Sequence, residues 1–258
     1  MDYEIIDFHT HPFCLDEENI CIYRRDSGMR LDTSVQYLKD LGITKICGSV
    51  ICREGKSPWE MIVKSNDRAL KIRDELGNFY IPGFHVHPGY VEQSCREIER
   101  MHSLRVRLVG ELVPYYHGWQ DYSCSEFDEI LDAAEQYGMV VSFHSMDNDQ
   151  MDAMVQKHPN LVLVAAHPNT MEHYQRHLDR MKLSKNYYLD LSGTGLFRHR
   201  MLRYGIDQCG ADRFLFGTDY PICSPAMYVG GVALDSNITE EEKRLILANN
   251  AKRLLQLS

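Results

Sequence analysis

Histidine and acidic side chains recur where short apolar runs of this chain end. His9 and His11 form an H-x-H pair, and side chains two residues apart point to the same face of a strand. Three further runs close in His144, His167 and Asp219. Several imidazoles and one carboxylate on converging strand ends would bind one metal ion together. Imidazole with carboxylate suits zinc, manganese, iron or cobalt better than calcium or magnesium.

Ligands of these types predict a metal ion that activates a bound water molecule. A divalent ion with an open coordination position lowers the pKa of bound water to near 7. We expect Asp219 to bind the ion and to move a proton as the general acid–base group, and His167 to act on the substrate. We expect zinc in the site, with manganese, iron and cobalt as alternatives.

The elements that must position these residues alternate along the chain. Eight β-rich runs are separated by segments with helical periodicity. The predicted strands cover residues 4–11, 44–52, 79–87, 107–113, 139–145, 161–167, 187–192 and 213–219. This alternation predicts one α/β domain over residues 1–258, a distorted (β/α)8 barrel of the TIM type. Active sites of such barrels lie at the C-terminal ends of the strands.

Helix-start signals support the assignment. Ser57 and Thr239 each begin a capping-box pattern, with Pro58 expected at the first helical position. Ser125 is expected to cap a third helix, and Gly77 and Gly138 to end two helices in the left-handed conformation.

Composition limits the partners. The chain of 258 residues has 28 basic and 37 acidic residues, a net charge of 28 − 37 = −9. This balance disfavours nucleic-acid and anionic-membrane binding. The longest aliphatic run, 161–166, is too short to span a bilayer, and no export signal precedes the first strand. The eight cysteines include no C-x-x-C pair, so we expect reduced thiols and a cytoplasmic protein.

A set of short motifs resembles the amidohydrolase superfamily, in its amidohydrolase-related branch. The motifs run in the family's order over nearly the whole chain. They are DFHTHP (7–12), VGELVPYYHGW (109–119), VSFHS (141–145), AAHP (165–168), LDLSGTG (189–195), LFGTDYPI (215–222) and NNAKRLLQL (249–257). The resemblance implies that His9, His11, His144 and Asp219 bind the catalytic metal. It implies that His167 binds a second metal or acts on the substrate.

Glu111 stands where many two-metal members of this superfamily have a carboxylated lysine. The sequence here resembles members, including a metal-dependent deoxyribonuclease branch, in which a glutamate bridges two ions. Alternatively, Glu111 holds a ligand histidine by a hydrogen bond, a role that metal sites nearly always need filled. The sequence leaves one and two ions open.

Other residues near the strand ends are candidates for substrate contact. An arginine could grip a substrate carboxylate with two hydrogen bonds, so we predict Arg53 and Arg198 as substrate-binding residues. A second H-x-H pair, His85 and His87, carries no ligand role in the resemblance. We predict core packing for His85 and hydrogen bonding for His87.

The sequence favours a metal-dependent hydrolase of a small carboxylate-bearing ester, lactone or amide. The alternative is a non-oxidative decarboxylase or hydratase of an unsaturated or aromatic acid. Decarboxylases of this branch are expected to carry longer insertions than 258 residues allow, which favours hydrolysis. A deoxyribonuclease and a non-catalytic metal-binding barrel rank below both. We expect a small-molecule substrate and leave open whether the chain forms a homo-oligomer.

Overall fold

The computed structural model describes residues 3–15, 18–23, 29–51, 57–195 and 198–257. Eight parallel strands form one sheet in the order β1 to β8, so the predicted α/β class and (β/α)8 topology are confirmed. The strands are β1 (Ile6–Asp7), β2 (Lys45–Gly48), β3 (Tyr80–Phe84), β4 (Leu108–Leu112), β5 (Val140–His144), β6 (Val162–Ala166), β7 (Tyr187–Asp190) and β8 (Phe214–Leu215).

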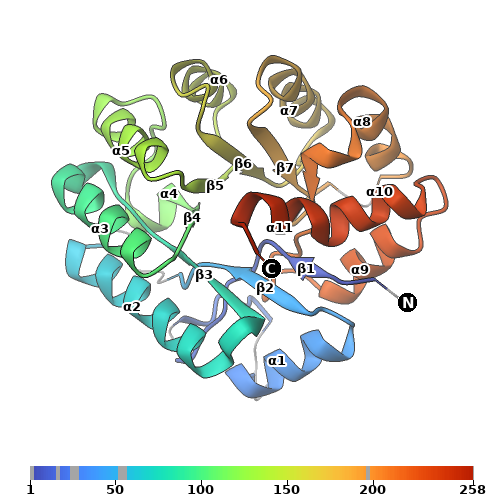
Figure 1. Ribbon diagram of the computed structural model, residues 1–258, viewed down its shortest axis with the longest axis horizontal. Coiled ribbons are helices and arrows are strands. Elements are labelled where there is room, and N and C mark those ends of the chain that lie inside the picture. The colour runs from blue at the N-terminus through green and yellow to red at the C-terminus, as the bar shows by residue number, and fades with distance from the viewer. Residues whose placement is uncertain (1–2, 16–17, 24–28, 52–56, 196–197, 258) are drawn as a thin grey trace.

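The helices form a ring outside the strands (Figure 1). They are α1 (Leu31–Asp40), α2 (Trp59–Leu76), α3 (Val91–Ser103), α4 (Pro114–His117), α5 (Ser125–Gln136), α6 (Asn148–Lys157), α7 (Met171–Leu183), α8 (Met201–Cys209), α9 (Pro225–Ala233), α10 (Glu240–Arg244) and α11 (Asn250–Leu255). A π-helical turn, Leu245–Asn249, joins α10 to α11. No helix in the described part of the chain has the length and hydropathy to cross a bilayer.

The barrel closes beyond the paired residues of its first and last strands. The backbone N–H of Phe8 donates to the carbonyl of Phe216 at 2.8 Å, and Thr10 forms a parallel bridge with Tyr220. The N–H of Asp219 also donates to the carbonyl of His9 at 2.8 Å. The strands are therefore shorter than predicted at this seam, but the extended segments that follow them remain joined.

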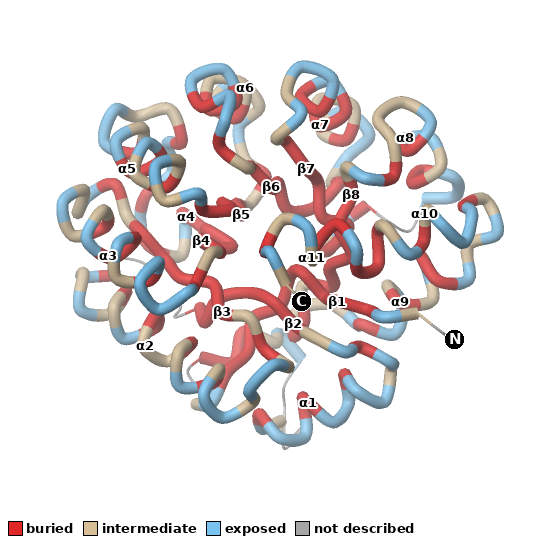
Figure 2. The backbone as a smooth tube through the Cα atoms, viewed as in Figure 1, coloured by how far each residue is buried: buried red, intermediate tan, exposed pale blue. Residues whose placement is uncertain are grey.

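Apolar side chains fill the barrel interior at the end opposite the strand C-termini. Seven of the eight strands contribute a side chain to one buried cluster, which Ala251 and Leu255 of α11 join, and Ile81 of β3 packs against it. Figure 2 shows the strands buried, while the helices are exposed on their outer faces. A second, larger core packs between the strands and the surrounding helices.

Two of the predicted helix caps are wrong. Pro58 is itself the N-cap of α2, and the Ser57 hydroxyl pairs with Nδ1 of His117 at 3.0 Å. Cys124 precedes α5, so Ser125 is the first helical residue. A serine hydroxyl can bond several kinds of partner, and neither Ser57 nor Ser125 caps a helix N–H. The capping box at Thr239 is confirmed.

Candidate metal centre

The predicted site residues meet at one rim of the barrel. Each lies at, or within four residues of, the C-terminal end of a strand, and the ends of parallel strands share one edge of the sheet. The residues are His9 and His11 after β1, Glu111 within β4, His144 at the end of β5, His167 after β6 and Asp219 after β8.

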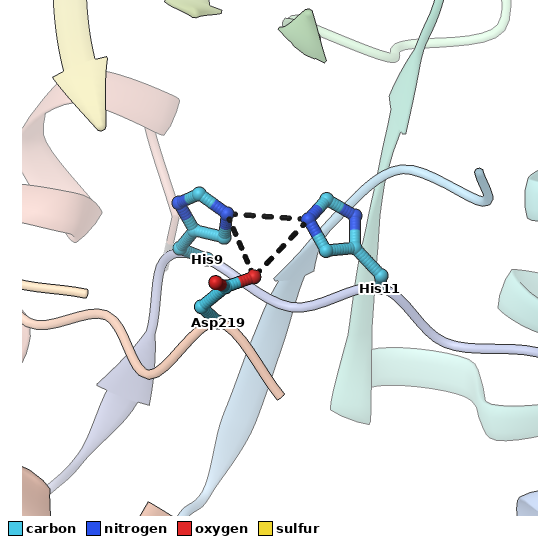
Figure 3. A group of neighbouring side chains, drawn as sticks. All are labelled: His9, His11 and Asp219. Carbon is cyan, nitrogen blue, oxygen red and sulfur yellow. Dashed lines mark hydrogen bonds and ion pairs between the residues drawn. The ribbon is translucent and has the colours of Figure 1, made fainter. Parts of the chain in front are cut away.

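Four donor atoms from three of these segments converge on one point. Figure 3 shows His9, His11 and Asp219 facing one another, with the two Nε2 atoms 3.2 Å apart and each 3.6 Å from Oδ1 of Asp219. Oε2 of Glu111 lies 3.1 Å from Nε2 of His9 and 3.2 Å from Nε2 of His11. Ligands about 2.1 Å from one ion stand about 3.0–3.4 Å apart in octahedral or tetrahedral geometry. The donor set and its spacing fit a divalent transition metal.

The second oxygen of Glu111 faces the other two histidines. Oε1 lies 2.9 Å from Nδ1 of His144 and 3.6 Å from Nε2 of His167, and these two imidazole rings are 4.8 Å apart. Glu111 is only 3% exposed, so its carboxylate is shielded from bulk water. This placement between two pairs of imidazoles is compatible with both roles predicted for Glu111, bridging ligand and orienting partner.

The Nδ1 atoms of His9 and His11 form hydrogen bonds on the side of each ring away from the candidate metal position. Nδ1 of His9 lies 2.9 Å from Oδ2 of Asp190, and Nδ1 of His11 lies 3.0 Å from the carbonyl of Ser49. Because carboxylate and carbonyl oxygens only accept hydrogen bonds, each Nδ1 carries a proton and can leave Nε2 as a metal-binding lone pair. The sequence analysis missed Asp190 and Ser192. Their alternation at the end of β7 repeats the signal that identified His9 and His11.

A buried carboxylate fixes the backbone beneath the site. Asp7 Oδ1 accepts hydrogen bonds from the N–H groups of His9 (3.2 Å) and Thr218 (2.9 Å), and Oδ2 accepts from the Thr218 hydroxyl (2.6 Å). Burial raises the pKa of Asp7 to about 7. These bonds connect the segment after β1 to the segment after β8, so they set the distance between the His9 and Asp219 side chains.

Two site residues have a strained backbone. His167 and Asp219 have φ values of 71° and 63°, a left-handed region that residues other than glycine seldom adopt. Gly193 makes room for His167, because a Cβ atom there would lie 2.2 Å from Nδ1 of the imidazole. Strain of this kind persists where the surrounding structure holds a functional side chain in place.

Burial and charge oppose each other in the centre. Burial alone would raise the pKa of Glu111, but the neighbouring imidazoles of His9, His11 and His144 hold it well below its usual value. Burial raises the pKa of Asp219, with His9 opposing the shift. The pKa of His9 is well above its usual value because the Glu111 and Asp190 carboxylates outweigh burial. A divalent cation would replace the proton that the carboxylates attract to His9.

Of the two predicted substrate-binding arginines, only Arg198 lies among the described residues. Nη1 of Arg198 donates to the carbonyl of Asn169 at 2.8 Å, two residues beyond His167. Arg53 lies outside the described residues. Both assignments remain predictions.

The second H-x-H pair makes its hydrogen bonds to loop backbone. Nε2 of His85 donates to the carbonyl of Val50 at 3.0 Å, and its ring lies 4.7 Å from that of His117. Nδ1 of His87 accepts from the N–H of Gly89, and Nε2 donates to the carbonyl of His117 at 3.0 Å. His85 is buried and His87 is half-buried.

Comparison with solved structures identifies the same architecture in several enzymes. A 2,6-dihydroxybenzoate decarboxylase from Rhizobium shares 16% identity, with a TM-score of 0.79 over 99% of both chains. A 5-carboxyvanillate decarboxylase from Sphingomonas paucimobilis shares 14%, with a TM-score of 0.72 over 99% of both chains. A dihydroxybenzoic acid decarboxylase from Polaromonas, solved with manganese and the inhibitor 2-nitroresorcinol, shares 17%, with a TM-score of 0.74 over 99% of this chain and 97% of that one.

These likenesses establish the fold. No curated protein matches the sequence. A family model described as amidohydrolase matches residues 6–257, which include every residue of the candidate metal centre. By this match over almost its full length, the chain belongs to the amidohydrolase family of metal-dependent enzymes.

Proposed function

We propose that this protein is a metal-dependent, non-oxidative decarboxylase of a small acid with an aromatic or unsaturated body. The observation that carries the proposal is the convergence of His9, His11, Glu111 and Asp219 at the rim of a barrel that aligns with decarboxylases almost end to end. The Rhizobium alignment covers 99% of both chains, so the two barrels correspond from end to end. Decarboxylation is therefore preferred here to the hydrolysis that the sequence favoured.

The site would hold a divalent transition ion through His9, His11, Asp219 and one or more of Glu111, His144 and His167. Bound there, the ion would orient the substrate and neutralise negative charge on its oxygens. Imidazole and carboxylate suit both zinc and manganese. The manganese in the Polaromonas enzyme makes manganese as strong a candidate as the zinc first expected.

The protein supplies the proton that the reaction needs. In decarboxylation the bond between the carboxyl carbon and the substrate breaks, carbon dioxide leaves, and the remaining carbon takes a proton. Asp219 is suited to deliver that proton because burial raises its pKa and its side chain is only 13% exposed. His167, held over the same rim, is suited to contact the substrate's polar group.

The partly exposed members of an apolar cluster at the rim are suited to contact the body of the substrate. Ile20, Ile51 and Val113 form a buried group separate from the main core, with Tyr116 and Ile222 packed against it. These residues lie after β1, β2, β4 and β8, the same ends that carry the metal-type donors. Binding sites for small molecules combine apolar walls with a few polar groups, as this rim does.

The test compares two reactions in one preparation. Zinc- and manganese-loaded protein is incubated with a panel of hydroxybenzoic acids and, separately, with esters, lactones and amides that carry a carboxylate. The proposal predicts carbon dioxide from at least one acid, lost after chelation and restored by metal. Chelator-sensitive hydrolysis, with no carbon dioxide from any acid, would favour the hydrolase, which uses the same ligands and the same Asp219.

A further inference from the structure

A buried serine connects two histidines of the centre. The Ser192 hydroxyl lies 3.0 Å from Nδ1 of His9 and 3.0 Å from Nδ1 of His167. It also donates a hydrogen bond to Oδ1 of Asp190, whose Oδ2 lies 2.9 Å from Nδ1 of His9. Ser192 and Asp190 are both fully buried. Neither residue belongs to the group of candidate donor atoms formed by His9, His11, Glu111 and Asp219.

The directions of these hydrogen bonds can be assigned from the chemistry of the groups. The Asp190 carboxylate accepts only, so the single hydroxyl proton of Ser192 points to its Oδ1. The Ser192 oxygen is then left as an acceptor, and Nδ1 of His167 must donate to it. His167 therefore carries its proton on Nδ1 and exposes the Nε2 lone pair toward Oε1 of Glu111, 3.6 Å away.

We propose that Ser192 is a positioning residue that links His167 to the Asp190 carboxylate by two hydrogen bonds. This link holds the His167 proton on Nδ1 and thereby keeps Nε2 free of a proton. One buried carboxylate then controls both imidazoles, His9 directly through Oδ2 and His167 through Ser192 and Oδ1. An unprotonated Nε2 can bind a metal ion or accept a hydrogen bond from a substrate, whereas a protonated one can do neither. The proposal concerns the proton on His167 and holds whichever reaction the enzyme catalyses.

Glu111 offers a second acceptor for the His167 proton, and this makes the assignment testable. Without Ser192, the nearest acceptor for a His167 proton among the described ion-pair contacts is Oε1 of Glu111, on the Nε2 side. Loss of the serine hydroxyl should then move the proton from Nδ1 to Nε2. We expect the ring to stay in place, because Gly193 lies close against its Nδ1 edge and the His167 backbone has a defined left-handed conformation.

The experiment reads the proton directly. Long-range ¹H–¹⁵N correlation spectra of histidine-labelled protein report which ring nitrogen is protonated, in both metal-free and zinc-loaded samples at pH 7.5. The His167 signals are assigned from their absence in His167→Gln. We expect the Nδ1-protonated form in the wild type in both states, and a shift to the Nε2-protonated form in metal-free Ser192→Ala. His9 should keep its Nδ1 proton, because Asp190 still accepts it.

Matched variants separate the loss of this link from a general loss of packing. Ser94→Ala removes another fully buried hydroxyl, one that bonds the backbone of His87 and not the centre, and should leave the His167 spectrum unchanged. Ser192→Thr keeps a hydroxyl and should restore the wild-type form. We also expect Ser192→Ala to lower metal affinity or turnover by about 10- to 100-fold, the range for lost outer hydrogen bonds.

Two results would overturn the proposal. One is an Nε2-protonated His167 in metal-free wild-type protein, which needs no variant to fold. The other is a folded Ser192→Ala protein whose His167 keeps its proton on Nδ1. Neither result depends on identifying a substrate, so failure of the Ser192 proposal is distinguishable from failure of the decarboxylase proposal.

Discussion

Replacement of Glu111 by glutamine distinguishes one metal ion from two. The carboxylate contacts four imidazole nitrogens, Oε2 at 3.1 and 3.2 Å and Oε1 at 2.9 and 3.6 Å. Glutamine keeps the shape but removes the charge, and its NH₂ group cannot accept on one of the two sides. If Glu111 orients the histidines, metal affinity should fall by about 10- to 100-fold, or about 1.4–2.7 kcal/mol, without change in stoichiometry.

We expect that result, with one tightly held ion per chain. The assay is elemental analysis of wild type and Glu111→Gln after dialysis and after loading with zinc or manganese, together with calorimetric titration of the metal-free proteins. Glu97→Gln is the matched control, because Glu97 is also buried but pairs with Asn66 and Arg100 away from the centre. Two ions in the loaded wild type, falling to one in Glu111→Gln, would refute the single-ion account and make Glu111 a bridging ligand.

Three further predictions address the candidate ligands, the proposed proton donor and acid stability. His9→Ala combined with His11→Ala should abolish most metal binding while the circular dichroism spectrum stays native, since the barrel core packs independently of the rim; normal metal content would exclude the pair as ligands. Asp219→Asn should lower turnover by at least about a hundredfold with metal partly retained, and near-normal turnover would remove Asp219 from the mechanism. Burial lowers the pKa of His117 to about 4 from 6.5, so its contribution to stability is present above pH 6.5 and is lost as the pH falls toward 4. Denaturant unfolding of metal-free protein at pH 7.5 and 5 should show about 2 kcal/mol more loss in wild type than in His117→Gln, and equal losses would contradict the assignment.

The sequence predicted the fold and the convergence of the candidate ligands because both have strong local signals. Alternating apolar runs predicted eight parallel strands, and that topology brings every strand end to one rim. Histidine and aspartate at those ends, together with Glu111 in β4, therefore had to meet, and they do. Residue type and strand position were enough to predict that these side chains lie close together.

The surrounding hydrogen bonds could not be predicted in the same way. Asp7 and Thr218 are 211 residues apart, and their pairing depends on how the barrel closes. Ser57 is followed by a proline-started helix, yet its hydroxyl bonds His117 because tertiary contacts override a local preference. Asp190 and Ser192 carried the period-two signal of a strand end. Their role became visible only when His9 and His167 were placed beside them.

Direct detection of carbon dioxide tests the central claim. Metal-free protein, protein reloaded with manganese or zinc, and reloaded Asp219→Asn are each incubated with the hydroxybenzoic acid panel, and released carbon dioxide is measured against the loss of acid. The account predicts release only with metal present, in a one-to-one ratio to acid consumed, and reduced by at least about a hundredfold in Asp219→Asn. Absence of carbon dioxide from every acid, with metal-dependent hydrolysis of an ester, lactone or amide by the same preparation, would contradict it.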